Sequence, residues 1–284
     1  MKRNEDLIKG WIESAPFWEK YHAALNAMFV PVTQSLIHDG IAGVAGQLAG
    51  QAILDVATGP GEPALTLAGL VGPKGSVVGV DPVPAMVEAA RREAARRQLA
   101  NVRFEVAFAD RLPFPDDTFD AVLSRFGVMF FPAPLEGIRE MLRVLRSGGG
   151  IAAAVWGSAD RNPFHYIFSR AIDRYIKSPP PEPGAPDAFR FAEPGELLAI
   201  FKVAGAVDTS DRILQFQIQT SIAVEDFWTM RCEISEKFRE KLTMLTKEQA
   251  TEVRREVITA ARTYSANDQL RFPAEIRVVS GRKL

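Results

Sequence analysis

Residues 53–65 read ILDVATGPGEPAL, and this stretch decides the fold. Its first five residues are apolar except for Asp55, which predicts a short buried β-strand. Gly59 and Gly61 follow, and glycines let the backbone turn sharply and let a bound molecule approach it closely. A helix is expected from Leu65 to Leu70, and the free N–H groups at its start suit a carboxylate or a phosphate. The stretch therefore predicts a cofactor loop between a strand and a helix.

The alternation of strand and helix continues downstream. The expected elements are a strand at 76–81, a helix at 84–99, strands at 102–110 and 119–126, a helix ending at 146 and a strand at 149–156. Such an order indicates a parallel sheet with right-handed crossovers and helices on both faces. The sequence therefore predicts an α/β fold with a doubly wound, mostly parallel sheet.

The flanking regions are expected to be mainly helical. Two apolar stripes with helical spacing precede the first strand, at Phe17, Tyr21, Ala24 and Met28 and at Ile37, Ile41, Val44 and Leu48. After the core we expect a helix at 162–176, a proline-rich segment at 178–189, a helix at 193–205, a strand at 212–218, a helical stretch at 224–264 and a strand at 275–283. These boundaries predict an N-terminal helical cap at 1–50, a core at 51–156, an insertion or lid at 157–192, and a C-terminal part at 193–284 with a helical insertion at about 223–265.

Composition narrows the class of protein. The chain has 284 residues, 47% of them hydrophobic, and its 34 Lys and Arg nearly balance its 35 Asp and Glu. This balance gives no reason to expect a nucleic acid partner. The single cysteine, Cys232, excludes an internal disulfide and a cysteine-type zinc site, and no other spacing suggests a metal. The charged N-terminus and the lack of a long apolar run predict a cytoplasmic protein without a membrane span.

Two further strands are expected to end in acidic residues. The second expected strand ends at Asp81 and the third at Asp110. The carboxyl ends of parallel strands meet at one edge of the sheet, so both carboxylates are expected beside the glycine loop. A carboxylate at the position of Asp81 can accept hydrogen bonds from both hydroxyls of a ribose. A carboxylate at Asp110 can accept a hydrogen bond from the exocyclic amine of an adenine. The edge is therefore suited to an adenosine.

With these features the chain resembles the class I S-adenosylmethionine-dependent methyltransferases, in the small-molecule branch similar to the ubiquinone and menaquinone C-methyltransferases. The resemblance covers residues 51–156, including FPDDTFDAVLSRFGVMFF at 114–131, with a weaker similarity at 191–206. The first loop of the family reads D-x-G-x-G-x-G, and this chain has Ala57 at the first glycine position. The resemblance implies a Rossmann-like sheet of seven strands, the last one antiparallel, with a helical cap over the cofactor-binding core.

The resemblance also implies the cofactor S-adenosylmethionine, the product S-adenosylhomocysteine, and transfer of a methyl group to a small organic acceptor. The loop would hold the methionyl end of the cofactor, and the ends of the second, third and fourth strands would border its ribose, adenine and methionine parts. The implied cofactor-binding residues are Asp55, Ala57, Thr58, Gly59, Gly61, Asp81, Pro82, Met86, Ala109, Asp110, Arg111, Arg125 and Phe126.

Candidates for the acceptor pocket and for catalysis come from the flanking regions. An imidazole with a pKa near neutrality suits a general base, which makes His22 and His165 the catalytic candidates. Aromatic and apolar residues around them suit an apolar or aromatic acceptor. The predicted acceptor pocket consists of Trp18, Tyr21, Met129, Trp156 and Tyr166.

Two other functions remain open on the sequence. Gly59, Gly61 and Ala64 also fit a G-x-G-x-x-A dinucleotide fingerprint, with Asp81 placed for the ribose of NAD. This reading predicts an NAD(P)-dependent oxidoreductase. A protein that binds S-adenosylmethionine without turning it over is the third reading. The sequence also leaves open the acceptor, the atom that is methylated, and whether the protein is a monomer or a homodimer.

Overall fold

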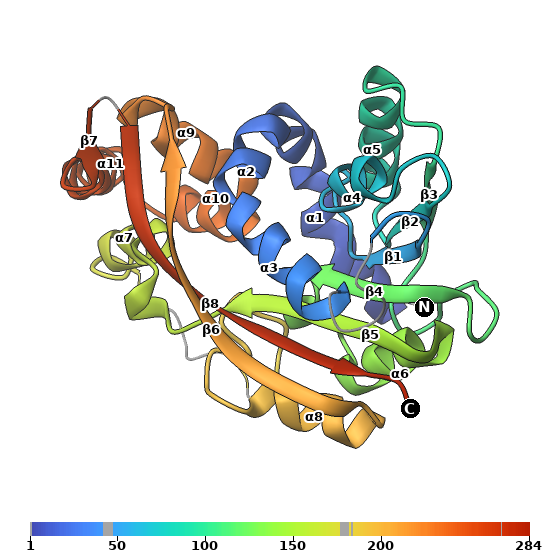
Figure 1. Cartoon of the computed structure of the whole chain (residues 1–284). Coiled ribbons are helices and arrows are strands. Elements are labelled where there is room, and N and C mark those ends of the chain that lie inside the picture. The colour runs from blue at the N-terminus through green and yellow to red at the C-terminus, as the bar shows by residue number, and fades with distance from the viewer. Residues whose placement is uncertain (1, 42–47, 177–181, 183, 268) are drawn as a thin grey trace.

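The computed structural model describes residues 2–41, 48–176, 182, 184–267 and 269–284. One mixed sheet runs through it in the order β3-β2-β1-β4-β5-β8-β6, with the short β7 paired to β8 (Figure 1). The strands are β1 (Ala52–Val56), β2 (Ser76–Asp81), β3 (Val102–Val106), β4 (Phe119–Arg125), β5 (Leu145–Trp156), β6 (Val207–Thr220), β7 (Ser265–Ala266) and β8 (Gln269–Arg282).

Helices cover the sheet and gather at one end of it. They are α1 (Lys2–Lys20), α2 (His22–Met28), α3 (Val30–Ile41), α4 (Ala64–Val71), α5 (Pro84–Arg96), α6 (Pro134–Val144), α7 (Pro163–Ile172), α8 (Glu196–Ala204), α9 (Val224–Ile234), α10 (Glu236–Thr243) and α11 (Lys247–Arg262). Two short 3₁₀ turns, η1 (Val128–Phe130) and η2 (Ala159–Arg161), follow β4 and β5. No helix in the described part of the chain is both long and apolar enough to cross a membrane.

The sheet is doubly wound, as predicted. Strands β1 to β5 are mutually parallel, and β8 is antiparallel to both β5 and β6. The crossovers β1-α4-β2 and β4-α6-β5 run in opposite directions along the sheet, so right-handed connections place α4 and α6 on opposite faces. Figure 1 shows α6 and α8 together below the sheet and α3 above it. Both faces of the central strands are therefore buried.

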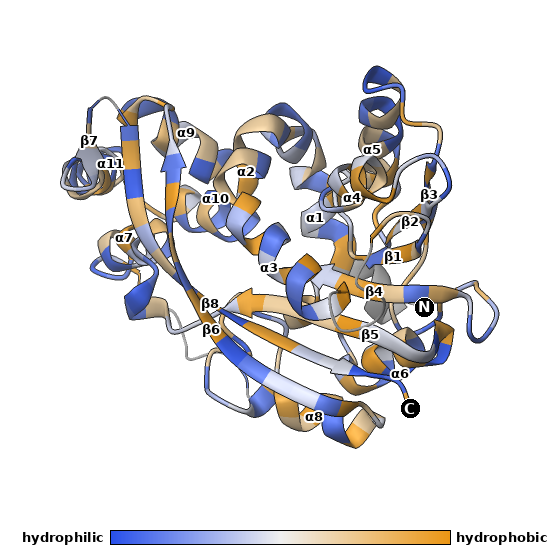
Figure 2. Cartoon of the chain, in the orientation of Figure 1, coloured by the Kyte–Doolittle hydropathy of each residue, from blue (hydrophilic) through white to orange (hydrophobic). Residues whose placement is uncertain are grey.

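The apolar run at the start of residues 53–65 forms most of β1, which lies in the middle of this sheet. Ile53 and Leu54 are fully buried on opposite faces of β1, as are Ala152 and Ala153 on β5. Parallel strands that are covered on both faces consist of nearly continuous apolar runs. The strands were predicted from these runs. Figure 2 shows the result, with the central strands mostly orange and the outer strand β6 largely blue or white.

The third strand is shorter than predicted. Strand β3 ends at Val106, whereas the sequence suggested residues 102–110. Within the described ranges β3 pairs with β2 alone, and β2 ends at Asp81, the partner of Val106. No strand there continues far enough to pair with a longer β3. Asp110 consequently lies in a turn four residues past the strand, and the expectation that it ends the third strand was wrong.

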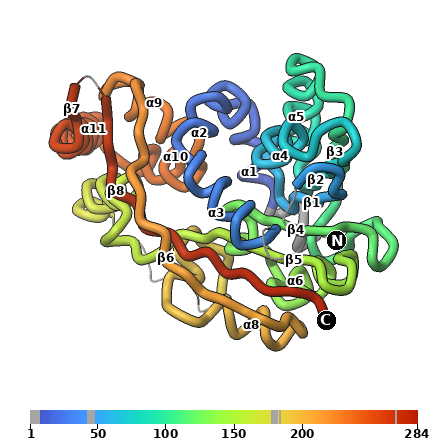
Figure 3. The backbone as a smooth tube through the Cα atoms, viewed as in Figure 1, coloured from blue at the N-terminus to red at the C-terminus, as the bar shows by residue number. Residues whose placement is uncertain are grey.

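The last strand is longer than predicted and carries a proline. Strand β8 begins at Gln269 rather than near Glu275. Its second half pairs with β5 on one side and with β6 on the other. Its first half keeps β6 as a partner, and among the described residues only Gln269 and Leu270 pair on the other side, with β7. Pro273 therefore needs no N–H donor on the side of β5. Figure 3 shows β6 and β8 side by side as a long ribbon that reaches beyond β5 toward α9 and α11.

The predicted helical regions differ in detail. The stretch at 224–264 is three helices, because the backbone is extended at Ser235 and Thr246, and Thr246 starts α11 with a capping box. Before the core, α3 ends at Ile41, and Leu48 lies outside any helix, so the second stripe was extended too far. Val44 and part of the proline-rich segment, at 178–181 and 183, lie outside the described residues.

Candidate functional site

The glycine loop joins β1 to α4 at the carboxyl edge of the sheet. Ala57, Gly59 and Gly61 have φ values of 61°, 56° and 113°, in the left-handed region that favours glycine. A side chain at Gly61 would collide with Leu65, whereas one at Gly59 would meet nothing within 4 Å. The space beside Gly59 is therefore open to a bound molecule.

Asp55 anchors this loop from inside. Its Oδ2 atom accepts hydrogen bonds from the Thr58 hydroxyl (2.6 Å) and from the Ala64 N–H (3.1 Å) at the start of α4. Its Oδ1 atom is buried and has no partner. Burial raises the pKa of Asp55 to about 7, although the hydrogen bond from Thr58 acts in the opposite direction. The carboxylate thus fixes the loop and closes the helix N-terminus.

Asp81 links the end of β2 to the loop. Its Oδ2 atom accepts the Gly59 N–H (2.9 Å), and its Oδ1 atom accepts the Val83 N–H (3.0 Å). Burial raises the pKa of Asp81 to about 6, while these two backbone donors lower it. Each carboxylate oxygen has two lone pairs, so one remains on each for a ribose hydroxyl. The geometry therefore fits the ribose of an adenosine.

The residues expected around the adenine differ in how deeply they are buried. Ala109 is half-buried, and Asp110 and Arg111 are exposed in the turn after β3. Pro82 is half-buried directly after Asp81. Met86 is 97% buried on α5, in a small cluster with Ala15 and Val83 against which Ile8, Trp11 and Trp18 of α1 pack. An adenine contact for these residues stays a prediction.

The end of β4 presents a cation and an aromatic ring. Arg125 donates to the Thr33 hydroxyl (2.8 Å) and to the Glu62 carbonyl (3.3 Å), which joins α3 to the glycine loop. Desolvation lowers the pKa of Arg125, and the nearby charges of Glu62 and Asp55 oppose that effect. Phe126 follows with a left-handed φ of 61° and so turns away from the strand direction. Contact of either residue with the methionine moiety of the cofactor stays a prediction.

An aromatic cluster continues from this strand end. Phe126 stacks on Trp156 at the end of β5, with ring centroids 4.7 Å apart and planes at 10°. Phe29 meets both rings edge-on, at 5.2 Å from Phe126 and 5.7 Å from Trp156. Met129 is fully buried in η1. The structure thus brings Phe126, a predicted cofactor residue, into contact with Trp156 of the predicted acceptor pocket. An acceptor contact for Trp156 and Met129 stays a prediction.

Trp18 and Tyr21, the N-terminal aromatic residues of the predicted acceptor pocket, connect the end of α1 to α9. The Trp18 Nε1–H donates to the carbonyl of Ile234 (3.2 Å), and the Tyr21 hydroxyl donates to Glu233 (2.6 Å). Their polar ends are thus used to join the N-terminal helices to the later helical insertion. Whether their rings also border an acceptor stays a prediction.

His22 lies close to the glycine loop. Its Nδ1 atom is 4.0 Å from Glu93 of α5, and its Nε2 atom is buried without a partner. Desolvation lowers the pKa of His22, although the charges of Glu62 and Glu93 oppose this, so the imidazole is neutral near pH 7. It borders a cavity of about 170 Å³ together with Pro60 of the loop. A neutral imidazole can accept a proton, so His22 stays a candidate for the general base.

His165 and Tyr166 lie on α7, beyond the end of β5. The His165 ring meets Trp156 edge-on with centroids 4.4 Å apart, and its Nδ1 atom is 3.2 Å from the guanidinium of Arg231. Burial and the charge of Arg231 hold the pKa of His165 well below its usual value. Tyr166 instead pairs its hydroxyl with that of Tyr264 (2.8 Å). His165 thus contacts Trp156 and Arg231, whereas Tyr166 contacts Tyr264.

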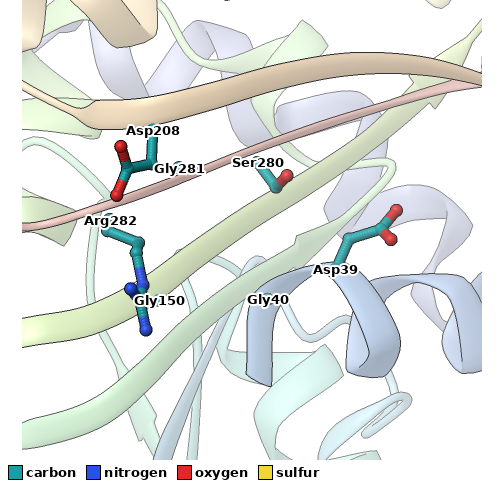
Figure 4. A pocket seen from close by; sticks show the side chains of 7 residues that line it. All are labelled: Asp39, Gly40, Gly150, Asp208, Ser280, Gly281 and Arg282. Carbon is teal, nitrogen blue, oxygen red and sulfur yellow. The ribbon is translucent and has the colours of Figure 1, made fainter. Parts of the chain in front are cut away.

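Another cavity, of about 230 Å³, lies away from this site. Figure 4 shows it between the end of α3 and the paired strands β5 and β8, with Asp39, Ser280 and Arg282 in its lining. It touches Gly150, in the first half of β5, whereas the glycine loop and Trp156 lie at the carboxyl ends of the strands. In the described residues, no group of His, Cys, Asp and Glu side chains is arranged to hold a metal ion.

Comparison with known proteins identifies the class. Residues 53–149 match a family model described as "Methyltransferase domain". The chain is 33% identical over 184 residues to the ubiquinone/menaquinone biosynthesis C-methyltransferase UbiE of Geobacter sulfurreducens, covering 60% of this chain and 70% of that protein. It is 40% identical over 126 residues to a demethylmenaquinone methyltransferase of Deinococcus radiodurans, covering 42% and 52%. The chain belongs to the class I S-adenosylmethionine-dependent methyltransferases.

Two further observations set the scope of this assignment. The chain spans about half the length of most of the curated relatives that it matches. Among solved structures, the YcgJ protein of Bacillus subtilis has a TM-score of 0.53 at 22% identity, covering 84% of this chain and 93% of that one. A putative methyltransferase of Bacillus halodurans has a TM-score of 0.54 at 20% identity, covering 88% and 98%. These structures share the fold.

The sequence alone missed several residues of the site. Phe29, Thr33 and Glu62 touch the predicted cofactor residues, and Arg231 touches His165. Arg231 was detectable, because it lies four residues after Phe227 on the apolar stripe of α9. An arginine on the buried face of a helix is unusual.

Proposed function

We propose that this protein transfers the methyl group of S-adenosylmethionine to a small organic acceptor with apolar or aromatic character. The observation that carries the proposal is the junction of Asp81 with Gly59. A buried carboxylate at the end of β2 is held against the glycine loop by a backbone hydrogen bond and keeps a lone pair on each oxygen. This is the arrangement that a ribose beside an open backbone surface requires.

A specific contact argues against the dinucleotide alternative. In a dinucleotide site, the pyrophosphate binds to free N–H groups at the helix N-terminus after the loop. Here the Ala64 N–H at that terminus already donates to the buried carboxylate of Asp55. A pyrophosphate would meet a second anion there when Asp55 is ionised. S-adenosylmethionine also carries a carboxylate, but its sulfonium and ammonium groups are cations, which a buried carboxylate stabilises.

The cofactor supplies an activated methyl group on a sulfonium, whose leaving group departs neutral. The chain itself is proposed to bind the cofactor and the acceptor, to orient them and to exclude water. Asp81 holds the ribose, the loop holds the methionyl end, and Arg125 and Phe126 border it. The rings of Phe126 and Trp156 form an apolar wall, and a neutral His22 accepts a proton where the acceptor loses one.

Calorimetric titration tests the proposal. The purified protein is titrated with S-adenosylmethionine, with S-adenosylhomocysteine and with NADH as the control ligand. Micromolar binding of the first two alone is the expected outcome, and turnover of a panel of acceptors then separates an enzyme from a non-catalytic binding protein. Binding of NADH without either sulfur compound would overturn the proposal in favour of an oxidoreductase.

A further inference from the structure

Arg231 is a buried cation without an anion. It lies on α9 and is only 4% exposed, and no carboxylate in the described part of the chain pairs with it. The other arginine in the buried polar set, Arg277, is 7% exposed and pairs with Asp211 at 2.8 Å. Burial of a charge without a partner costs several kcal/mol. Arg231 thus differs from Arg277 in that no carboxylate of the described residues neutralises its charge.

Aromatic rings surround the guanidinium instead. Its central carbon lies 4.3 Å from the ring centroid of Phe164 and 5.5 Å from those of Phe168 and Phe238. Such contacts stabilise a cation but satisfy none of its N–H donors. The Nε atom of Arg231 is buried and has no hydrogen-bond partner. Desolvation lowers the pKa of Arg231 to about 9, which leaves the group charged near neutral pH.

His165 adds a second donor without a partner. An arginine only donates, so the His165 Nδ1 atom, 3.2 Å from the guanidinium, is the acceptor of that contact. The neutral ring then carries its proton on Nε2, which is buried and unpartnered. Arg231 and His165 are thus in contact, and each keeps one buried N–H group without a partner. This tautomer makes His165 a donor rather than a base.

The pair lies on the acceptor side of the proposed cofactor site. His165 meets Trp156 edge-on, and Trp156 stacks on Phe126 at the end of β4. Two successive ring contacts therefore connect the methionine region to the Arg231 and His165 donors. Figure 1 shows α7, α9 and α10 at the end of the sheet toward which β4 and β5 point.

We infer that Arg231 and His165 form an anion site that holds a carboxylate of the methyl acceptor, so the acceptor is an aromatic or apolar acid. The planar guanidinium matches the two oxygens of a carboxylate, and the surrounding rings accommodate the apolar remainder of the molecule. The carboxylate serves as a binding group and is not itself consumed. This inference rests on the proposed methyl transfer.

Binding of matched acid and amide pairs tests the inference without requiring turnover. The probes are benzoate, cinnamate and 2-naphthoate with their primary amides, titrated into the protein saturated with S-adenosylhomocysteine. At least one acid is expected to bind about tenfold or more tightly than its amide. In Arg231→Met the preference should fall to near unity, while affinity for S-adenosylhomocysteine stays unchanged.

A second measurement, of the melting temperature, tests whether Arg231 has only a structural role. Removal of a buried charge that lacks an anion should leave the melting temperature of ligand-free Arg231→Met at or above the wild-type value. Arg239→Met is the matched control, because Arg239 lies over Phe17 but already donates to Ser14. That variant should be less stable and should keep the acid preference.

The outcomes separate the two proposals. Equal binding of acids and amides, no binding of any acid, or a preference that survives in Arg231→Met would overturn the inference, as would a fall of about 5 °C or more in the melting temperature of that variant. If S-adenosylhomocysteine binds and the acid preference is absent, only the inference fails. If the cofactor product does not bind, the methyltransferase proposal fails, and the acid and amide pairs titrated into the ligand-free protein still test the anion site.

Discussion

Replacement of Asp55 by asparagine should remove a large part of the pH dependence of stability. The wild-type carboxyl group is fully buried, with one oxygen bound by Thr58 and Ala64 and the other without a partner. An asparagine oxygen accepts the same two hydrogen bonds, and its amide group takes the place of the unpartnered oxygen. The variant therefore preserves the loop but cannot ionise.

The magnitude follows from the pKa of Asp55, which burial raises from 3.8 to about 7. A carboxyl group with a raised pKa in the folded state contributes most stability below its unfolded pKa and loses that contribution as the pH rises through the folded pKa. The full shift corresponds to about 4 kcal/mol, of which about 2.5 kcal/mol falls between pH 5 and pH 8. Wild-type protein should thus lose that amount relative to Asp55→Asn over this range.

Urea unfolding followed by circular dichroism measures the difference directly. Both proteins are unfolded without ligand at pH 5, 6, 7 and 8, and the free energy of unfolding is compared at each pH. Asp81 and the other titrating groups are common to both proteins and cancel in the comparison. A difference between the two pH profiles below about 0.5 kcal/mol would refute the assignment of a raised pKa to Asp55.

Two further substitutions test the loop. Asp81→Asn should weaken S-adenosylhomocysteine binding by about tenfold or more, because hydrogen bonds to a charged group contribute about 1.5–3 kcal/mol; unchanged affinity in calorimetry, with a retained melting transition, would contradict the ribose assignment. Ala57→Gly should raise the free energy of unfolding by about 0.5 kcal/mol, since alanine is strained at a φ of 61°, and a loss of stability in urea unfolding would show that packing of the Ala57 methyl group outweighs the strain.

Local sequence signals were sufficient for the core of the fold. Strand β2 spans the predicted residues 76–81, because its apolar run is bounded by a glycine turn and by Asp81. The order of strands and helices also predicted the doubly wound sheet, since the handedness rule leaves few alternatives. The loop residues Gly59 and Gly61 were found for the same reason, as each carries a backbone requirement that is visible in one residue type.

Features that depend on distant partners could not be read from the sequence. The end of β3 is set by the length of β2, and the true position of Asp110 followed only from that pairing. The ribbon of β6 and β8 extends through contacts between strands that lie about fifty residues apart in sequence. The surroundings of Arg231 arise from α7, α9 and α10 together, so their apolar and aromatic character becomes evident only in three dimensions.

The place of β8 in the sheet has a consequence for synthesis of the chain. Strand β8 is inserted between β5 and β6, so neither neighbour has a complete ladder before residues 269–282 leave the ribosome. Until then the nascent chain exposes the unpaired apolar edge of β5, where Ile151 to Val155 are fully buried in the finished protein. Such an edge readily pairs with other chains. The period between synthesis of β5 and of β8 is thus the time at which this protein most needs chaperone protection.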